Sequence, residues 1–100
     1  MPRIRNDRND STDQLFRAIL SLRDLDECER FFGDLLTVQE LSAFAQRLQV
    51  ARMLSEGKTY EAIRGEIATS SSTITRVNTE LRYGSGGYKM VLDRLRDQTE

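Results

Sequence analysis

The sequence predicts an all-α protein of about six helices, and three observations support this fold class. Apolar residues recur at spacings of three and four along most of the chain, which is the period of an amphipathic helix. The single proline is Pro2, so no proline interrupts a later helix. No segment shows the alternation of apolar and polar residues that is typical of a half-buried strand. Because 100 residues leave room for only a small core, a second copy could supply part of it.

Two short helices are expected in the first third of the chain, after a disordered arm formed by residues 1–10. The first covers about residues 11–25. The second starts at Asp26, whose spacing to Glu29 resembles a capping box. It stops near Gly33, since glycine readily adopts the left-handed conformation found at helix ends. Residues 11–100 are expected to form a single helical domain.

A long helix is predicted from Thr37, which forms a capping box with Glu40. Its apolar pattern continues to Leu54, and Gly57 marks its end. The helix has about 18 residues and is therefore roughly 27 Å long. Because a helix of this length is large for so short a chain, we expect it to span a homodimer.

The next two helices have the layout of a helix-turn-helix, over about residues 59–82. Thr59 caps the first helix, and Ala68-Thr69-Ser70 forms the corner. Without a glycine there, either Ala68 or Thr69 adopts the left-handed conformation at a cost of about 1 kcal/mol, or the corner avoids it. The inward-facing residues are Ile63, Ile67, Ile74, Val77 and Leu81. A Gly-Ser-Gly-Gly break precedes a last helix from Tyr88 to about Gln98.

The exposed face of the second short helix suits recognition of double-stranded DNA. It carries Ser71, Ser72, Thr75, Arg76 and Thr79. Small residues allow close approach to base edges, hydroxyls can contact phosphates, and arginine can pair with guanine through two hydrogen bonds. Two short helices with a Ser/Thr corner also occur in many domains that bind no DNA, and this alternative stays open.

The composition restricts the other function classes. The net charge of −1 argues against a nonspecific nucleic-acid binder, although residues 57–89 carry five cations against three acids. The absence of histidine, of a glycine-rich phosphate loop and of a base to activate Cys28 argues against an enzyme and against a metal site. A lone cysteine fits a reducing cytoplasm. No apolar run reaches the roughly 18 residues of a membrane span.

Beyond these patterns, the chain resembles the Trp repressor superfamily, especially its TrpR-related YerC/YecD branch. The resemblance covers about Phe31 to Leu95. It includes Leu35-Leu36-Thr37, passes through Arg47, and is sharpest at Ser72-Thr73-Ile74-Thr75-Arg76. It implies an intertwined helical homodimer whose recognition helices enter successive major grooves about 34 Å apart. By position, it also implies that Arg64 contacts a phosphate or base, that Thr73 contacts a phosphate, and that Ser71, Ser72, Thr75 and Arg76 lie on the base-reading edge.

The resemblance also locates a ligand pocket, which this sequence alters. In the Trp repressor, two arginines sandwich the indole of tryptophan, and the Leu-Leu-Thr segment of the partner subunit helps to hold it. The corresponding residues here are Leu35, Leu36, Thr37, Gln49, Arg76 and Val77. Gln49 supplies no cation where an arginine is expected, and Val77 adds bulk where glycine is expected. We therefore predict that tryptophan does not bind and that no cofactor is needed.

The sequence thus favours a sequence-specific, homodimeric DNA-binding regulator, most simply a repressor. A helical protein-interaction module or adaptor with a vestigial DNA face is the alternative from another class. A weak, ligand-free, chromosome-associated binder is a third hypothesis.

Overall fold

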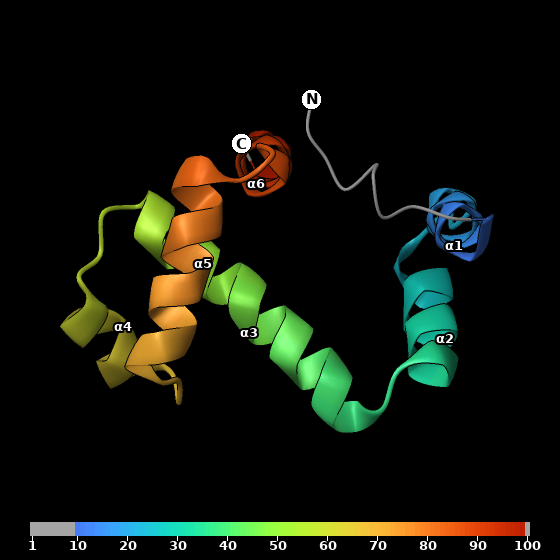
Figure 1. Cartoon of the computed structure of the whole chain (residues 1–100). Coiled ribbons are helices and arrows are strands. Elements are labelled where there is room, and N and C mark those ends of the chain that lie inside the picture. Colours follow the sequence, from blue (N-terminus) through green and yellow to red (C-terminus); the bar gives the residue numbers. More distant parts are fainter. Residues whose placement is uncertain (1–9, 100) are drawn as a thin grey trace. The chain divides into compact units, whose positions relative to one another are not determined.

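The structure, a computed structural model, describes residues 10–99, which form six helices and no strand (Figure 1). The helices are α1 (Asp10–Leu20), α2 (Leu25–Leu35), α3 (Val38–Ser55), α4 (Tyr60–Glu66), α5 (Ser71–Tyr83) and α6 (Gly87–Thr99). The predicted all-α class is therefore confirmed. The predicted N-terminal arm lies almost entirely outside the described residues. The chain divides after Leu41 into two compact units, called here the N-terminal and C-terminal units.

In the N-terminal unit, the boundary between the first two helices differs from the prediction. Helix α1 ends at Leu20, and α2 begins two residues after Arg23. The Asp24 carboxylate accepts a hydrogen bond from the Glu27 backbone N–H at 2.9 Å, and the Glu27 carboxylate accepts one from the Arg23 N–H at 2.9 Å. The cap is therefore Asp24 and not the predicted Asp26, and the Glu27 carboxylate bonds the residue before the cap and not the cap itself.

The predicted end of the second helix was also wrong. Helix α2 continues through Gly33, whose φ is not positive. It ends where the backbone N–H of Leu36 donates to the carbonyl of Phe32 at 3.0 Å. Gly33 is therefore an ordinary helical residue, and the helix gains two residues beyond the predicted stop.

Helix α3 has the predicted start and length. The Thr37 hydroxyl accepts from the Glu40 N–H at 3.0 Å, the Glu40 carboxylate accepts from the Thr37 N–H at 2.9 Å, and 18 residues follow. Beyond its end, Gly57 adopts the left-handed conformation with φ of 89°. This positive φ is costly for any residue other than glycine, so the predicted stop signal is confirmed.

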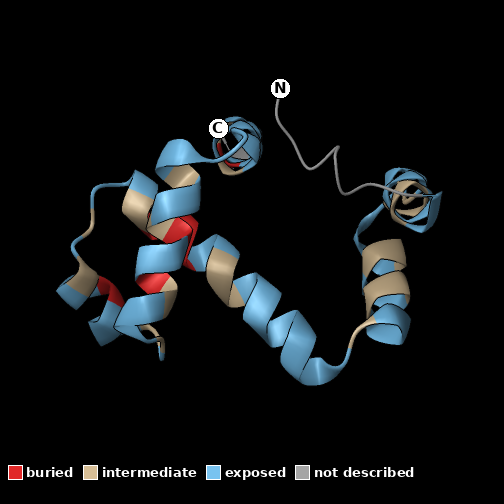
Figure 2. Ribbon diagram, viewed as in Figure 1, coloured by how far each residue is buried: buried red, intermediate tan, exposed pale blue. Residues whose placement is uncertain are grey.

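The core lies in the C-terminal unit, where α3, α4, α5 and α6 supply all buried side chains among the described residues (Figure 2). These are Val50, Ala51, Met53, Ile63, Ile74, Val77 and Leu92. Ile63 of α4 and Ile74 of α5 are fully buried, so the helix-turn-helix helices pack as predicted. The apolar pattern from Leu41 through Phe44 to Leu48, which indicated the long helix, is instead exposed on the other side of α3.

Candidate nucleic-acid interface

The corner between α4 and α5 is extended and needs no left-handed residue. Helix α4 starts at its cap Thr59, whose hydroxyl accepts from the Ala62 N–H at 3.1 Å. It ends at Ile67, whose backbone is extended with φ of −136° and ψ of 154°. No non-glycine residue in the described chain has a positive φ. Of the two sequence-based options for Ala68 and Thr69, the corner therefore takes the unstrained one.

Hydroxyl groups organise the N-terminus of α5. The cap Ser70 accepts a hydrogen bond from the Thr73 N–H at 3.1 Å, and its own hydroxyl lies 3.0 Å from the Thr73 hydroxyl and 3.1 Å from that of Ser72. Arg64 of α4 donates to the Ser71 hydroxyl at 3.0 Å. The bond from Ser70 satisfies one of the free N–H groups of a helix start, and the bond between Arg64 and Ser71 joins α4 to α5.

Helix α3 holds the corner through a residue that the sequence analysis did not single out. The side-chain amide of Gln46 donates to the backbone carbonyl of Ala68 at 2.7 Å, across 22 residues of sequence. Next to this carbonyl, the hydroxyl oxygen of Thr69 is buried without a hydrogen-bond partner among residues 10–99. Neither the Gln46 hydrogen bond nor the burial of Thr69 has a local sequence signal, because each depends on how separate elements pack.

The structure places the predicted DNA-contacting side chains on one accessible region of the helix-turn-helix. Thr73 is half-buried, and the others are exposed: Arg64, Ser71, Ser72, Thr75, Arg76 and Thr79. The Thr79 hydroxyl donates to the Thr75 carbonyl at 3.0 Å, so only its oxygen lone pairs stay available. No hydrogen bond or ion pair within the described chain holds Arg76. Its guanidinium therefore projects from α5 without an internal acceptor.

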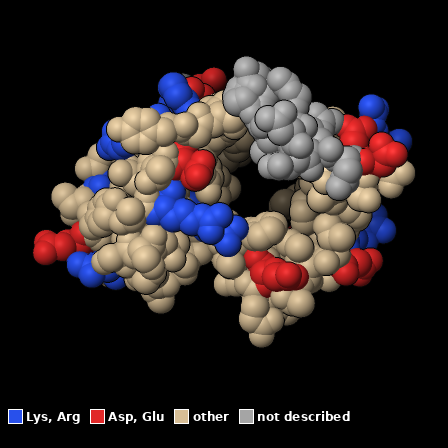
Figure 3. All heavy atoms as spheres, viewed as in Figure 1, with Lys and Arg blue, Asp and Glu red and all other residues tan. Residues whose placement is uncertain are grey.

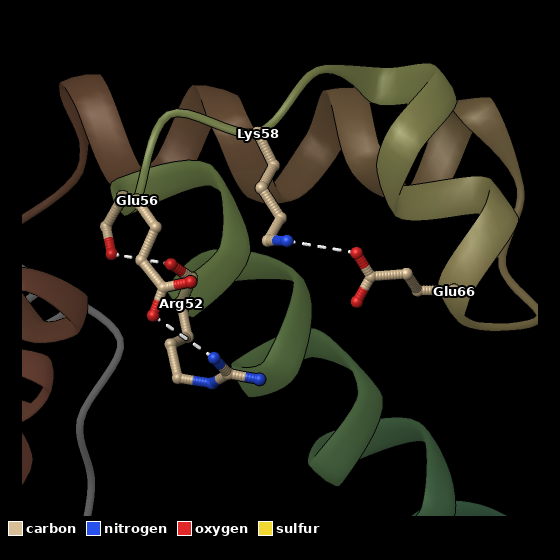
Figure 4. Close-up of polar contacts among 5 residues, drawn as sticks. Arg52, Glu56, Lys58 and Glu66 are labelled. Carbon is tan, nitrogen blue, oxygen red and sulfur yellow. Dashed lines mark hydrogen bonds and ion pairs between the residues drawn. The ribbon is translucent and has the colours of Figure 1, made fainter.

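Positive charge near this region comes from separate side chains and not from a continuous basic surface. In the face that Figure 3 shows, Lys and Arg are interspersed with Asp and Glu. Lys58 points toward Glu66 of α4, with a nitrogen–oxygen distance of 3.0 Å (Figure 4). Arg52 likewise pairs with Glu56, which directly follows the end of α3, at 3.1 Å. Arg76, which is exposed and has no such partner among residues 10–99, therefore keeps its charge uncompensated.

The residues predicted for the ligand pocket occupy different environments. In the C-terminal unit, Gln49 and Arg76 are exposed, whereas Val77 is 1% exposed and belongs to the core. In the N-terminal unit, Leu36 is half-buried and Leu35 and Thr37 are exposed. The Thr37 hydroxyl is already used to cap α3.

Arg47, which also belongs to α3, was not among the residues predicted for the ligand pocket. It is half-buried, and its guanidinium carbon lies 5.5 Å from the centroid of the Phe44 ring. It precedes the buried residues Val50 and Ala51 by three and four positions, so it lies on the side of α3 that faces the core. Gln49 also precedes a buried residue, Met53, by four positions, but it is itself exposed. Helix periodicity therefore does not separate Arg47 from Gln49, and only their exposure does.

Within residues 10–99, no helix is both long and apolar enough to cross a bilayer. The same residues contain no group of three or more His, Cys, Asp or Glu side chains arranged to hold a metal ion.

Comparison with known proteins gives one consistent result. Residues 10–96 match the profile of the Trp repressor protein family. The uncharacterised protein YerC of Bacillus subtilis is 53% identical over 90 residues, which are 90% of this chain and 86% of YerC. A crystal structure of a candidate Trp repressor from Staphylococcus aureus superposes with a TM-score of 0.89 and 44% identity, covering 96% of both chains. A TrpR-like protein from Eubacterium eligens gives a TM-score of 0.86 and 46% identity, covering 90% of this chain and 93% of its own.

Proposed function

Because the chain belongs to the Trp repressor family, a family of DNA-binding regulators, we propose that it represses transcription as a homodimer bound to specific duplex sequences. In this proposal, α5 enters the major groove, and Arg76 and Thr75 contact base edges. Ser71, Ser72, Thr73 and Arg64 contact the phosphates and bases nearby. The proposal assigns the chain no catalytic role.

The accessible guanidinium of Arg76 is the observation that carries this proposal. A side chain with five hydrogen-bond donors and no internal acceptor is available for guanine or phosphate. The α5 N-terminus supports it, because its hydroxyl-rich first turn lets a helix end approach DNA closely. The Arg64–Ser71 hydrogen bond of 3.0 Å holds the two helices in one arrangement.

The homodimer accounts for the exposed apolar side of α3. Leu41, Phe44 and Leu48 are 42%, 48% and 37% exposed within the single chain, and they lie at spacings of three and four. Contiguous exposed apolar surface of this kind marks an interface. In a symmetric dimer, the two copies of α5 would read half-sites whose centres lie about 34 Å apart.

We propose that tryptophan is not the effector. Val77 fills its place in the core with its side chain, and Gln49 offers no cation. Since Arg47 supplies a guanidinium on the core-facing side of α3, this part of the proposal rests mainly on Val77. Calorimetric titration with L-tryptophan should give no binding heat, and a mobility shift that requires added tryptophan would contradict it.

The DNA-binding proposal is tested by selecting bound duplexes from a random pool and measuring affinity by fluorescence anisotropy. Arg76→Ala should weaken binding to the selected site by about 1–3 kcal/mol, or roughly 5- to 150-fold. Arg94→Ala removes the same charge from an exposed position of α6 and is the matched control. Its effect should be small and independent of sequence.

Two outcomes would overturn this proposal. If no duplex shows salt-sensitive binding, the protein-interaction function replaces it. If both arginine variants weaken binding equally on selected and random duplexes, then Arg76 provides only charge, and the chromosome-associated function is the better description.

A further inference from the structure

The C-terminal unit contains a polar cavity on the side of α5 away from Arg76. It has a volume of about 450 Å³, within the range of roughly 300–1,000 Å³ that is typical of ligand pockets. Its walls come from the ends of α3 and α5 and from α6. Three cationic side chains line it, Arg82, Lys89 and Arg96, against a single acidic one, Asp93.

Two of these cations already converge on a carboxylate. Lys89 lies 3.4 Å and Arg96 lies 2.9 Å from oxygens of Asp93. Burial acts to raise the pKa of Asp93, but the hydrogen bonds and charges of Lys89 and Arg96 outweigh this effect and lower it. Asp93 is therefore ionised at neutral pH. The side chains that line the cavity thus comprise three cations and one anion, so Asp93 alone does not balance them.

Arg82 is oriented but not neutralised. Its Nε donates to the amide oxygen of Asn78 at 3.0 Å, which fixes the direction of the guanidinium without compensating its charge. The remaining guanidinium donors are left for another acceptor. A pre-oriented arginine of this kind loses less side-chain entropy when it binds an anion.

Apart from Ser55, the rest of the wall is apolar. Leu54 and Leu81 are half-buried and Leu92 is buried, and all three line the cavity. The hydroxyl of Ser55 donates to the Arg52 carbonyl at 2.7 Å, so toward a ligand it can only accept. A ligand that fits this wall has a short apolar skeleton beside its negative charge.

We propose that this cavity binds a small organic anion with two negative charges next to an apolar group, such as an organic phosphate, through Arg82 and Lys89. Because Arg82 belongs to the same helix as Arg76, a bound anion would lower the positive charge of α5. The lower charge would weaken DNA binding, and this consequence rests on the proposed function. The binding of the anion itself does not rest on the proposed function.

The direct test measures anion binding without DNA. Phenyl phosphate and inorganic phosphate are titrated by calorimetry and by amide NMR, with ionic strength held constant by NaCl. Phenyl phosphate should bind more tightly, and the amide signals of Leu81, Arg82 and Leu92 should shift. The double variant Arg82→Gln/Lys89→Gln should lose about tenfold or more in affinity, since it removes two charge-assisted contacts.

The matched control is Arg23→Gln/Arg94→Gln, which removes the same charge from two exposed residues that do not line the cavity. It should keep the affinity for phenyl phosphate. Equal losses in both double variants, or equal affinity for the two phosphates, would overturn the proposal.

A second experiment determines whether Arg82 and Lys89 bind a free anion or a phosphate of the DNA backbone. If Arg82→Gln/Lys89→Gln weakens DNA binding and flattens its salt dependence while no variant binds phenyl phosphate, these cations contact the DNA backbone. That outcome overturns the cavity proposal and leaves the proposed function intact. If wild-type protein binds phenyl phosphate but no DNA, the proposed function fails and the cavity proposal stands.

Discussion

The two units of the chain differ in how they bury apolar side chains. In the N-terminal unit, no described residue is buried, and Leu20, Leu25 and Val38 are 83%, 75% and 81% exposed. In the C-terminal unit, seven residues form a closed core. Since the hydrophobic effect scales with apolar area removed from water, the C-terminal unit gains more stability from burial within the single chain. An amphipathic pattern thus predicts a helix in both units but does not show what covers its apolar side.

The largest expected effect comes from opening the core of the C-terminal unit. Ile74→Ala should lower the free energy of unfolding by about 2–5 kcal/mol, because it removes a fully buried side chain between α5 and its neighbours. Denaturant titration measures the change. Tyr83→Ala, at an 82% exposed position of the same helix, is the control and should shift stability by less than about 0.5 kcal/mol. Equal effects would contradict the assignment of the core.

The next prediction concerns the N-terminal unit. If a second copy covers its apolar residues, Leu20→Ser/Leu25→Ser should weaken the homodimer, since each fully buried leucine contributes about 1.5–3 kcal/mol. Sedimentation equilibrium at several concentrations measures the dissociation constant. Tyr83→Ser removes an apolar group elsewhere and should leave it unchanged. A monomeric wild-type protein would contradict the proposed assembly. So would a dimer whose dissociation constant does not change when both leucines are replaced.

A smaller effect is expected where α3 holds the corner. Gln46→Glu replaces the donor to the Ala68 carbonyl with a group that cannot donate. This change should lower the free energy of unfolding by about 1–3 kcal/mol and disturb the geometry of the corner. The melting temperature should fall, and affinity for the selected duplex should fall with it. Gln39→Glu adds the same charge near the start of the same helix without this contact. If the two variants behave alike, Gln46 does not position the corner.

The smallest effect concerns the pH dependence of the C-terminal unit. Because the folded protein lowers the pKa of Asp93 from 3.8, its contribution to stability is complete above that value and is lost as the pH falls through the folded pKa. Asp93→Asn should therefore be less stable than wild type at neutral pH, and the difference should shrink in acid. Denaturant titrations along a pH series measure it. Asp97→Asn, which removes the same charge from an exposed position of α6, is the matched control.

Much of the candidate interface could be predicted because its signals are local. The caps Thr37 and Thr59, the left-handed Gly57 and the inward positions Ile63, Ile74 and Val77 depend on a few neighbouring residues. Where two local signals competed, prediction failed. Asp24 and Asp26 both offer an N-cap, and α2 starts at Asp24, where the Glu27 carboxylate also accepts from the N–H of Arg23 before the cap.

By itself, the sequence determined the helices, their order and the exposed arginine and hydroxyl face of α5, because hydrogen bonds between near neighbours and helical periodicity decide these features. Only the tertiary structure decided which side of α3 carries the core, how Gln46 reaches the Ala68 carbonyl, and how the ends of α3 and α5 meet α6 around the polar cavity. Each of these features joins residues from different helices. Their free energy arises only after packing brings the helices together, so no local pattern encodes them.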